Sequence, residues 1–381
     1  MRRRRFDFHN QWEDNKFFMN KILYLDHAAA GIPDEVLLKR RAELDRECFG
    51  NQESGHALGF ALRERIDAAA RELGRALWHT DSARVVWGTN CTELFNLLAA
   101  SPLVGGKRAV SSVLEHPALT AALKRNAKEV KLLRSDAGGR VAAEAYENVS
   151  LVAIHQVQSE IGAVQDTAKI FAAYPGAVRF VDAAQAAGKL ELADADIAAV
   201  SGAKLGVPGG GAALLLNPNW RGAGKFADFA ASYRRNEHLI GRVDPVLPPL
   251  LAYAAAWHME NREREFARIS ELNKRLREGV LKIGGAFPTL DFEAASPYIL
   301  HLTVPKHQGA VLMRMLAGVG IMVSAGSACA AESKDPSPAM LALGASRETA
   351  YAGVRIGMGH STPDDAPEIF LAAWKKVLQN Y

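Results

Sequence analysis

The fold class follows from two neighbouring segments, Val178-Arg179-Phe180-Val181-Asp182 and Ile197-Ala198-Ala199-Val200-Ser201-Gly202-Ala203-Lys204. Each is a short apolar run that ends in polar residues, as the buried strands of a parallel sheet do. Similar runs occupy residues 84–87, 108–112, 151–155 and 212–216, and helical or polar connections separate them. This alternation predicts an α/β protein whose large, mostly parallel sheet is covered by helices on both faces.

The organisation of the chain changes after residue 243, where two proline-containing turns occur. A long helical stretch over residues 250–283 follows, and then a mixed pattern of short strands and helices. We therefore expect a large domain over residues 21–248 and a connecting helix with a smaller C-terminal α+β domain over residues 249–381. Residues 1–20 are basic at the start but have no apolar centre, so we expect a disordered tail rather than a secretory signal.

Composition excludes several classes of protein. The net charge of +4 comes from 46 basic and 42 acidic residues, and removing Arg2–Arg5 leaves the two signs equal. No basic stripe indicates nucleic-acid binding, and no apolar run approaches the length of about 20 residues that a membrane span needs. The three cysteines are far apart and the histidines are scattered, so we expect no disulfide framework and no metal site, in a reducing cytoplasm.

Polar residues follow several of the expected strands, at the edge where parallel sheets bind ligands. One group, Thr89-Asn90-Cys91-Thr92, lies between a strand and a helix, and Glu115-His116-Pro117 opens another helix. Asp182 ends a strand, and Lys204 follows the next one. Taken singly, these residues could be helix caps, a surface turn and a solvated lysine. Together they supply a phosphate-binding helix start, an aromatic ring, an acid and an amine, as a pyridoxal phosphate site requires.

The chain resembles the class V aminotransferases, and among them most closely the cysteine desulfurases, from about residue 22 to its C-terminus. The resemblance rests on seven motifs that occur in the family's order. They are Tyr24-Leu25-Asp26-His27-Ala28-Ala29, Glu115-His116-Pro117, Ser159-Glu160-Ile161-Gly162, Val181-Asp182-Ala183-Ala184-Gln185, Ser201-Gly202-Ala203-Lys204, Ser324-Ala325-Gly326-Ser327-Ala328-Cys329 and Val354-Arg355-Ile356-Gly357-Met358-Gly359. The resemblance implies a fold-type-I pyridoxal-phosphate enzyme and a homodimer.

The resemblance also implies a role for each residue that matches a motif. Lys204 is expected to hold the cofactor and later to move protons at the substrate Cα. Asp182 is expected to pair with the pyridine nitrogen, and His116 to stack on the ring and act as an acid or base. The remaining cofactor contacts are expected from Cys91, Thr92, Ser159, Gln185 and Ser201. The substrate contacts are expected from Arg355, which binds the carboxylate, and His27.

Cys329 decides which reaction we expect. In a cysteine desulfurase a thiolate attacks the substrate sulfur, so Cys329 is expected to become a persulfide while L-cysteine becomes L-alanine. A structural cysteine is the alternative reading of this residue. The other functions considered are an aminotransferase, a selenocysteine lyase or another C–S lyase, and a catalytically impaired binding protein with the same fold. A protein that accepts the sulfur is a further expected partner.

Four positions depart from the family's pattern. Ala203 stands where the family usually has His, Ser159 where it has Asn, and His27 where Asn is common. Gly241-Arg242 is the nearest match to a phosphate contact that the family makes with Thr across the dimer. These departures bear on the substrate and the rate more than on the cofactor.

Overall fold

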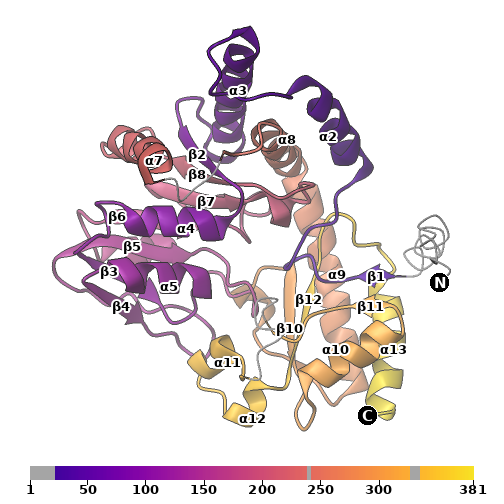
Figure 1. Ribbon diagram of the computed structural model, residues 1–381. Coiled ribbons are helices and arrows are strands. Elements are labelled where there is room, and N and C mark those ends of the chain that lie inside the picture. Colours follow the sequence, from indigo (N-terminus) through magenta and orange to yellow (C-terminus); the bar gives the residue numbers. More distant parts are fainter. Residues whose placement is uncertain (1–21, 238–241, 327–334) are drawn as a thin grey trace, which may run out of the picture.

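The structure is a computed structural model that describes residues 22–237, 242–326 and 335–381 (Figure 1). Its large sheet has seven strands in the order β2-β8-β7-β6-β5-β3-β4. Their bounds are β2 Arg84–Gly88, β3 Arg108–Ser112, β4 Glu129–Leu133, β5 Val149–His155, β6 Val178–Asp182, β7 Ile197–Ser201 and β8 Ala212–Leu216. Neighbouring strands from β7 to β4 are parallel, whereas β8 runs antiparallel to both β7 and β2. The predicted α/β fold with a mostly parallel sheet is confirmed.

Helices cover both faces of this sheet. The first face carries α3 Ala57–Trp78, α6 Thr167–Ala172 and α8 Leu247–Glu260, which bury their apolar residues in one cluster. The opposite face carries α4 Cys91–Ala100, α5 Pro117–Asn126 and α7 Ala223–Glu237, which belong to another cluster. Val152 enters the first cluster and Leu151 the second, because successive side chains of a strand point to opposite faces. Helix α2 (Glu35–Glu47) contacts α8.

A second group of elements is built mainly from the last third of the chain. Its three-stranded antiparallel sheet has the order β12-β10-β9, and a separate parallel pair joins β1 to β11. The strands are β1 Leu23–Tyr24, β9 Phe287–Pro288, β10 Ile299–Thr303, β11 Ile321–Met322 and β12 Gly353–Gly357. The helices are α9 Arg262–Ile283, α10 Gly309–Gly318, α11 Pro338–Ala342, α12 Arg347–Ala350 and α13 Ala366–Gln379, with a 3₁₀ turn at Phe292–Ala294.

The expected boundary at residues 248/249 does not coincide with the division between the hydrophobic cores. Leu250 and Leu251 of α8 pack in a core of the large sheet, whereas Leu272 of α9 packs in the C-terminal core together with Leu23. The expectation of one continuous helical stretch is also wrong, because α8 ends and α9 begins at Asn261. The Asn261 side chain donates from Nδ2 to the carbonyl oxygen of Trp257 at 2.8 Å, and this bond closes the last turn of α8.

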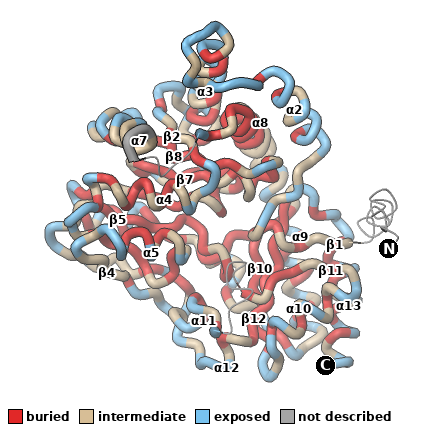
Figure 2. Tube along the Cα trace, in the orientation of Figure 1, coloured by how far each residue is buried: buried red, intermediate tan, exposed pale blue. Residues whose placement is uncertain are grey.

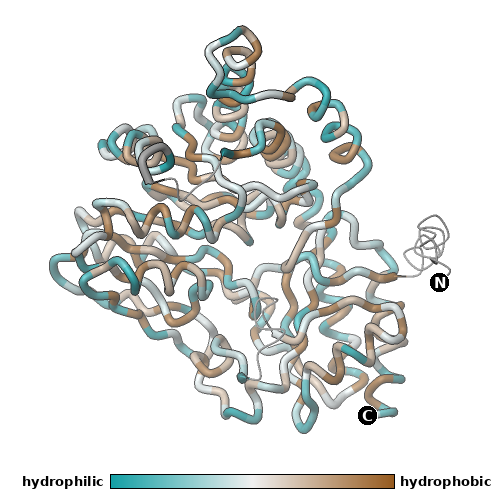
Figure 3. Tube along the Cα trace, viewed as in Figure 1, coloured by the Kyte–Doolittle hydropathy of each residue, from teal (hydrophilic) through white to brown (hydrophobic). Residues whose placement is uncertain are grey.

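The buried and the hydrophobic residues are concentrated in the sheets of the two groups of elements. Buried residues run through the strands of the large sheet and through β10 and β12 in Figure 2. Figure 3 places hydrophobic residues along those strands and mainly hydrophilic ones along α2. Among the helices of the described ranges, none is both long and apolar enough to cross a membrane.

The register of the central strands determines which side chains meet at the edge of the sheet. His155, the last residue of β5, is the Cα partner of Asp182, the last residue of β6. Asp182 in turn is paired with Ala199 of β7, and the chain continues from β7 into a 3₁₀ turn at Gly202–Leu205. The side chains that follow these strands therefore face one shared volume at the carboxyl edge.

Candidate active site

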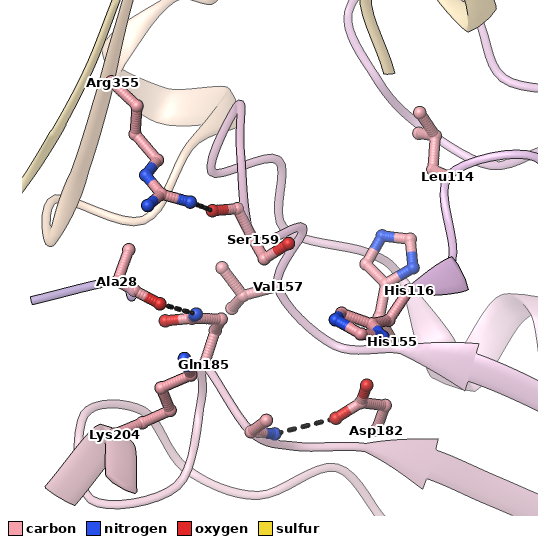
Figure 4. A pocket seen from close by; sticks show the side chains of 11 residues that line it. Ala28, Leu114, His116, His155, Val157, Ser159, Asp182, Gln185, Lys204 and Arg355 are labelled. Atoms are coloured by element: carbon pink, nitrogen blue, oxygen red, sulfur yellow. Dashed lines mark hydrogen bonds between the residues drawn. The ribbon is translucent and has the colours of Figure 1, made fainter. Parts of the chain in front are cut away.

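A pocket of about 550 Å³ lies at this edge of the sheet (Figure 4). It brings together six of the residues predicted for the site, namely His116, Ser159, Asp182, Gln185, Lys204 and Arg355. The rest of its lining is Ala28, Leu114, His155, Val157 and Ala184.

Lys204 is presented to the pocket by a tightly packed turn. A Cβ atom on Gly202 would lie 2.2 Å from the carbonyl oxygen of Gly210, so this position accepts only glycine without a shift of the backbone. The Gly31 amide donates to the carbonyl oxygen of Ala203 at 2.7 Å, and the Lys204 amine donates to the carbonyl oxygen of Ala29. The loop around Ala29 therefore holds both the backbone and the amine of this turn.

Asp182 is a buried carboxyl group at the end of β6. Its Oδ1 accepts a hydrogen bond from the Ala184 amide at 3.0 Å. Burial raises the pKa of Asp182, whereas the Ala184 amide and the histidines at positions 116 and 155 act in the opposite direction. The alternative role as a helix cap is wrong, because residues 184–189 form turns rather than a helix. A buried carboxylate in this setting is stabilised by a cationic partner.

Gln185 is held at both ends of its amide group. Its Nε2 donates to the carbonyl oxygen of Ala28 at 2.8 Å, and its Oε1 accepts from the Lys189 amine at 3.5 Å. The second hydrogen of Nε2 remains for a ligand, because an amide nitrogen carries two donors. Lys189 is itself buried, and burial together with the charge of Lys204 lowers its pKa to about 7.

His116 caps helix α5 and also lines the pocket. Its Nδ1 accepts a hydrogen bond from the Ala118 amide at 3.2 Å, and Pro117 occupies the first turn of the helix. Figure 4 shows its ring on the wall of the pocket, above Asp182. The reading of His116 as an ordinary surface turn is therefore wrong, since its side chain faces the pocket.

His155 was not predicted from the sequence, although it also lines the pocket. Its Nδ1 lies 2.7 Å from Glu115 Oε1, and the two side chains are 5% and 0% exposed. His155 Nε2 and Glu115 Oε2 are buried and have no hydrogen-bond partner within the described residues. The signal that could have identified His155 was available, because it is a polar residue that ends an apolar strand.

Arg355 lies in the middle of β12, on the opposite wall of the pocket. Its Nη2 forms an ion pair with Asp26 Oδ1 at 2.7 Å, and its Nη1 donates to the carbonyl oxygen of Ser159 at 2.9 Å. The side-chain hydroxyl of Ser159 points toward the pocket in Figure 4. A guanidinium group has five N–H donors, so donors remain for a ligand carboxylate.

The predicted phosphate contacts lie beside the pocket and do not line it. The Asn90 side chain caps α4 by accepting from the Glu93 amide at 2.9 Å, so the amides of Cys91 and Thr92 have no partner inside the helix. Burial, helped by the charge of Asp182, raises the pKa of the Cys91 thiol well above its usual range. Ser201, the last residue of β7, interacts with the same thiol. Free amides at a helix start suit a phosphate group.

His27 lies in a different cavity from the other predicted substrate residue. This second cavity has a volume of about 380 Å³ and is lined by His258, His360, Lys189 and Lys204, among others. Burial, together with the charges of Lys189 and the two other histidines, lowers the pKa of His27 to about 3. The structure therefore does not bring the His27 side chain into the pocket with Arg355.

Cys329 lies outside the described residues. The segment that leads to it is anchored beside the pocket, because Ser324 and Arg355 exchange two backbone hydrogen bonds of 3.1 and 2.7 Å. The two described cysteines are poor nucleophile candidates. Burial raises the pKa of the Cys48 thiol as it does that of Cys91, and the thiolate is the reactive form.

Comparison with known proteins relates this chain to a family. The aminotransferase class-V family matches residues 23–366. The cysteine desulfurase IscS of Shewanella denitrificans is 29% identical over 376 residues, which cover 91% of this chain and 90% of that protein. The NifS-like protein of Rickettsia africae has a TM-score of 0.81 at 22% identity, over 94% of this chain and 99% of that chain. The apo cysteine desulfurase of Thermococcus onnurineus has a TM-score of 0.78 at 19% identity, over 97% and 98%. The chain therefore belongs to the aminotransferase class-V family, and its fold is that of the fold-type-I enzymes.

Proposed function

We propose that this chain is a pyridoxal-phosphate-dependent cysteine desulfurase, which converts L-cysteine to L-alanine and takes the sulfur onto Cys329. The observation that carries the proposal is the meeting of Lys204, Asp182 and Arg355 in one pocket, although they are far apart in the sequence. An amine, a buried acid and a guanidinium group then face one small volume. The names of the relatives, which are cysteine desulfurases, support the choice of substrate.

The residues present fit pyridoxal phosphate. Lys204 supplies an amine for covalent attachment, and the buried Asp182 carboxyl group would gain a cationic partner from a protonated pyridine nitrogen. The start of α4 supplies the amides of Cys91 and Thr92 for a phosphate group. His116 supplies a flat ring on one wall. The amine, the buried carboxyl group and the helix-start amides therefore match the groups of the cofactor.

The chain's own residues would perform the remaining work. Bound pyridoxal phosphate supplies an electron sink that stabilises negative charge at the substrate Cα. Lys204 would move the proton at that carbon, and Gln185 would donate a hydrogen bond to the phenolic oxygen of the ring. Arg355 would bind the substrate carboxylate through two parallel N–H donors. His116 would donate or accept a proton on the face of the ring that it covers.

The sulfur transfer needs a thiolate, which we assign to Cys329. Its sulfur would attack the sulfur of the substrate, so that an S–S bond forms while the C–S bond breaks with its electron pair on the substrate carbon. That carbon takes up a proton, and the product leaves as alanine. The expected homodimer, and a protein that accepts the sulfur from Cys329, belong to this proposal as well.

The test compares the wild type with Cys329→Ser after incubation with cysteine. We expect the wild type to gain the mass of one sulfur atom on the peptide that contains Cys329 and to release alanine. Cys329→Ser should bind pyridoxal phosphate unchanged but form neither product, because a hydroxyl group does not accept sulfur. Lys204→Ala is the control, and borohydride should attach the cofactor to the Lys204 peptide in every protein except this variant.

Two results would contradict the proposal. If borohydride never attaches the cofactor to Lys204 in the wild type, the assignment of pyridoxal phosphate is wrong. If the cofactor attaches but no persulfide forms, while amino groups pass between amino acids and keto acids, the protein is an aminotransferase. Cys329 would then be structural.

A further inference from the structure

Glu115 and His155 form a buried pair that has no role in the proposed mechanism. The two side chains are almost completely buried, and Glu115 Oε1 lies 2.7 Å from His155 Nδ1. The same oxygen accepts a hydrogen bond from the Ser112 hydroxyl at 2.8 Å.

The contact with Glu115 orients the His155 ring. We assign the donor of the 2.7 Å contact to Nδ1–H of a neutral imidazole, which leaves a free lone pair on Nε2. The same arrangement of carboxylate and histidine orients metal-binding and catalytic imidazoles in other proteins. Here it turns Nε2 away from Glu115.

Nε2 of His155 lacks a partner although it is buried, and His155 lines the pocket. Leaving such a nitrogen without a hydrogen bond is costly, so a buried acceptor of this kind is expected to meet a donor in the complete complex. Its neighbour on the next strand is Asp182, because His155 and Asp182 are paired residues at the ends of β5 and β6. Figure 4 shows the His155 ring between His116 and Asp182. Two acceptors thus lie side by side at one end of the pocket.

We propose that His155, oriented by Glu115, is a further cofactor-binding residue whose Nε2 accepts a hydrogen bond at the end of the pocket that takes the protonated ring nitrogen. This inference rests on the proposed binding of pyridoxal phosphate. It assigns His155 to the recognition of the ring's N–H group, in addition to Asp182. The pocket then selects a heteroaromatic ring with a protonated nitrogen over a ring of the same shape without one.

The test measures how much the contribution of the ring nitrogen to cofactor affinity depends on His155. Dissociation constants are measured for pyridoxal phosphate and for its 1-deaza analogue, in which C–H replaces the ring nitrogen. Both compounds carry the aldehyde, so their intrinsic difference in attachment to Lys204 cancels when the ratio of the two constants is compared between the wild type and a variant. The wild type should prefer pyridoxal phosphate. In His155→Met this preference should fall by about tenfold, which corresponds to about 1.4 kcal/mol.

Matched variants separate recognition from folding. His155→Gln keeps a polar acceptor near the position of Nε2, so it should retain more of the preference than His155→Met. Because His155→Met leaves the buried Glu115 carboxylate without its partner, the double variant Glu115→Gln/His155→Met removes that charge as well. The double variant should fold, as circular dichroism will verify, and should show the same tenfold loss of preference.

The outcomes of this test are distinct. If His155→Met and the double variant bind both compounds more weakly but keep the wild-type preference, His155 only shapes the pocket and the inference is wrong. If the wild type binds neither compound, the proposed cofactor itself is wrong. A wild type that binds pyridoxal phosphate no better than the analogue would also overturn the inference.

Discussion

Arg355 is a buried cation that forms an ion pair with one carboxylate, Asp26, among the described residues. Its side chain is 2% exposed and that of Asp26 is 20% exposed, with 2.7 Å between Nη2 and Oδ1. Taking an arginine out of water is costly, and the pair offsets this cost only while both partners are present. The buried Arg355 side chain therefore depends on Asp26, which lies 329 residues away in the sequence.

We predict that Asp26→Asn lowers the free energy of unfolding by about 2 to 3 kcal/mol, since the buried guanidinium loses its counter-charge. Urea denaturation measures this change. The matched control is Asp364→Asn, because Asp364 also pairs with an arginine, Arg268, at 2.9 Å but is 78% exposed. The control should change stability by less than about 1 kcal/mol. Equal effects in the two variants would argue against a special role for the buried pair.

Individual site residues could be predicted from the sequence where they end apolar runs or match a family motif. Lys204, Asp182 and Arg355 were found in this way, and all three line the pocket. His155 satisfied the first criterion and was missed, because its partner Glu115 is 40 residues away and only the fold brings them together. His27 matched a motif, yet its side chain faces another cavity. A motif determines the path of the backbone better than the direction of one side chain.

The turn that carries Lys204 shows how elements constrain each other. Gly202 approaches Gly210 so closely that a Cβ atom would lie 2.2 Å from a carbonyl oxygen. The backbone around Gly210 therefore packs directly against the turn at Gly202 and fixes its position.

We predict that Gly202→Ala destabilises the protein by about 1 to 3 kcal/mol, as overpacking in a dense interior does. It should also weaken the binding of pyridoxal phosphate, because Lys204 is two residues away. The control is Gly224→Ala in the first turn of α7, where an added Cβ atom meets no atom within 4 Å apart from its chain neighbours and the backbone of its own helix. This control should be neutral or stabilise the protein by up to about 1 kcal/mol. Thermal unfolding measures the change in stability, and a titration with pyridoxal phosphate measures the change in binding. A Gly202→Ala protein with the stability and the cofactor affinity of the wild type would contradict both predictions.

Most strands of the large sheet could be predicted from their apolar runs, and the bounds of β3 and β8 agree with those expected. The edge strand β4 was missed, because Glu129 and Lys131 break its apolar pattern. The break between α8 and α9 was missed because Asn261 is compatible with a helix. What ends α8 there is packing, since the two helices bury their apolar faces in different cores.

At the scale of the whole molecule, buried histidines make stability depend on pH. Burial lowers the pKa of His27 and of His301 to about 3, and that of His258 to about 4. In the unfolded chain each titrates near 6.5. Between pH 6.5 and about 4 the unfolded chain therefore binds more protons than the folded protein, so stability is full above pH 6.5 and falls as the pH decreases.

We predict that the free energy of unfolding decreases below pH 6 by about 1.4 kcal/mol per pH unit for each of these histidines. Urea denaturation between pH 7.5 and pH 5 measures the slope. His301→Gln removes one titrating group, so its stability should fall less steeply by about 1.4 kcal/mol per pH unit. If the free energy of unfolding falls equally steeply with decreasing pH in the wild type and in the variant, His301 does not contribute to the pH dependence of stability.

The pairing of β1 with β11 links the order of synthesis to the order of folding. Leu23 and Tyr24 leave the ribosome early, yet their partners Ile321 and Met322 are made almost 300 residues later. Arg355, which completes the pocket opposite Lys204, is made later still. Until then the apolar side chains of Leu23 and Leu25 have no core to enter, and an unpaired strand invites aggregation. A growing chain can thus fold its large sheet first, but Arg355 joins the pocket only when translation is nearly finished.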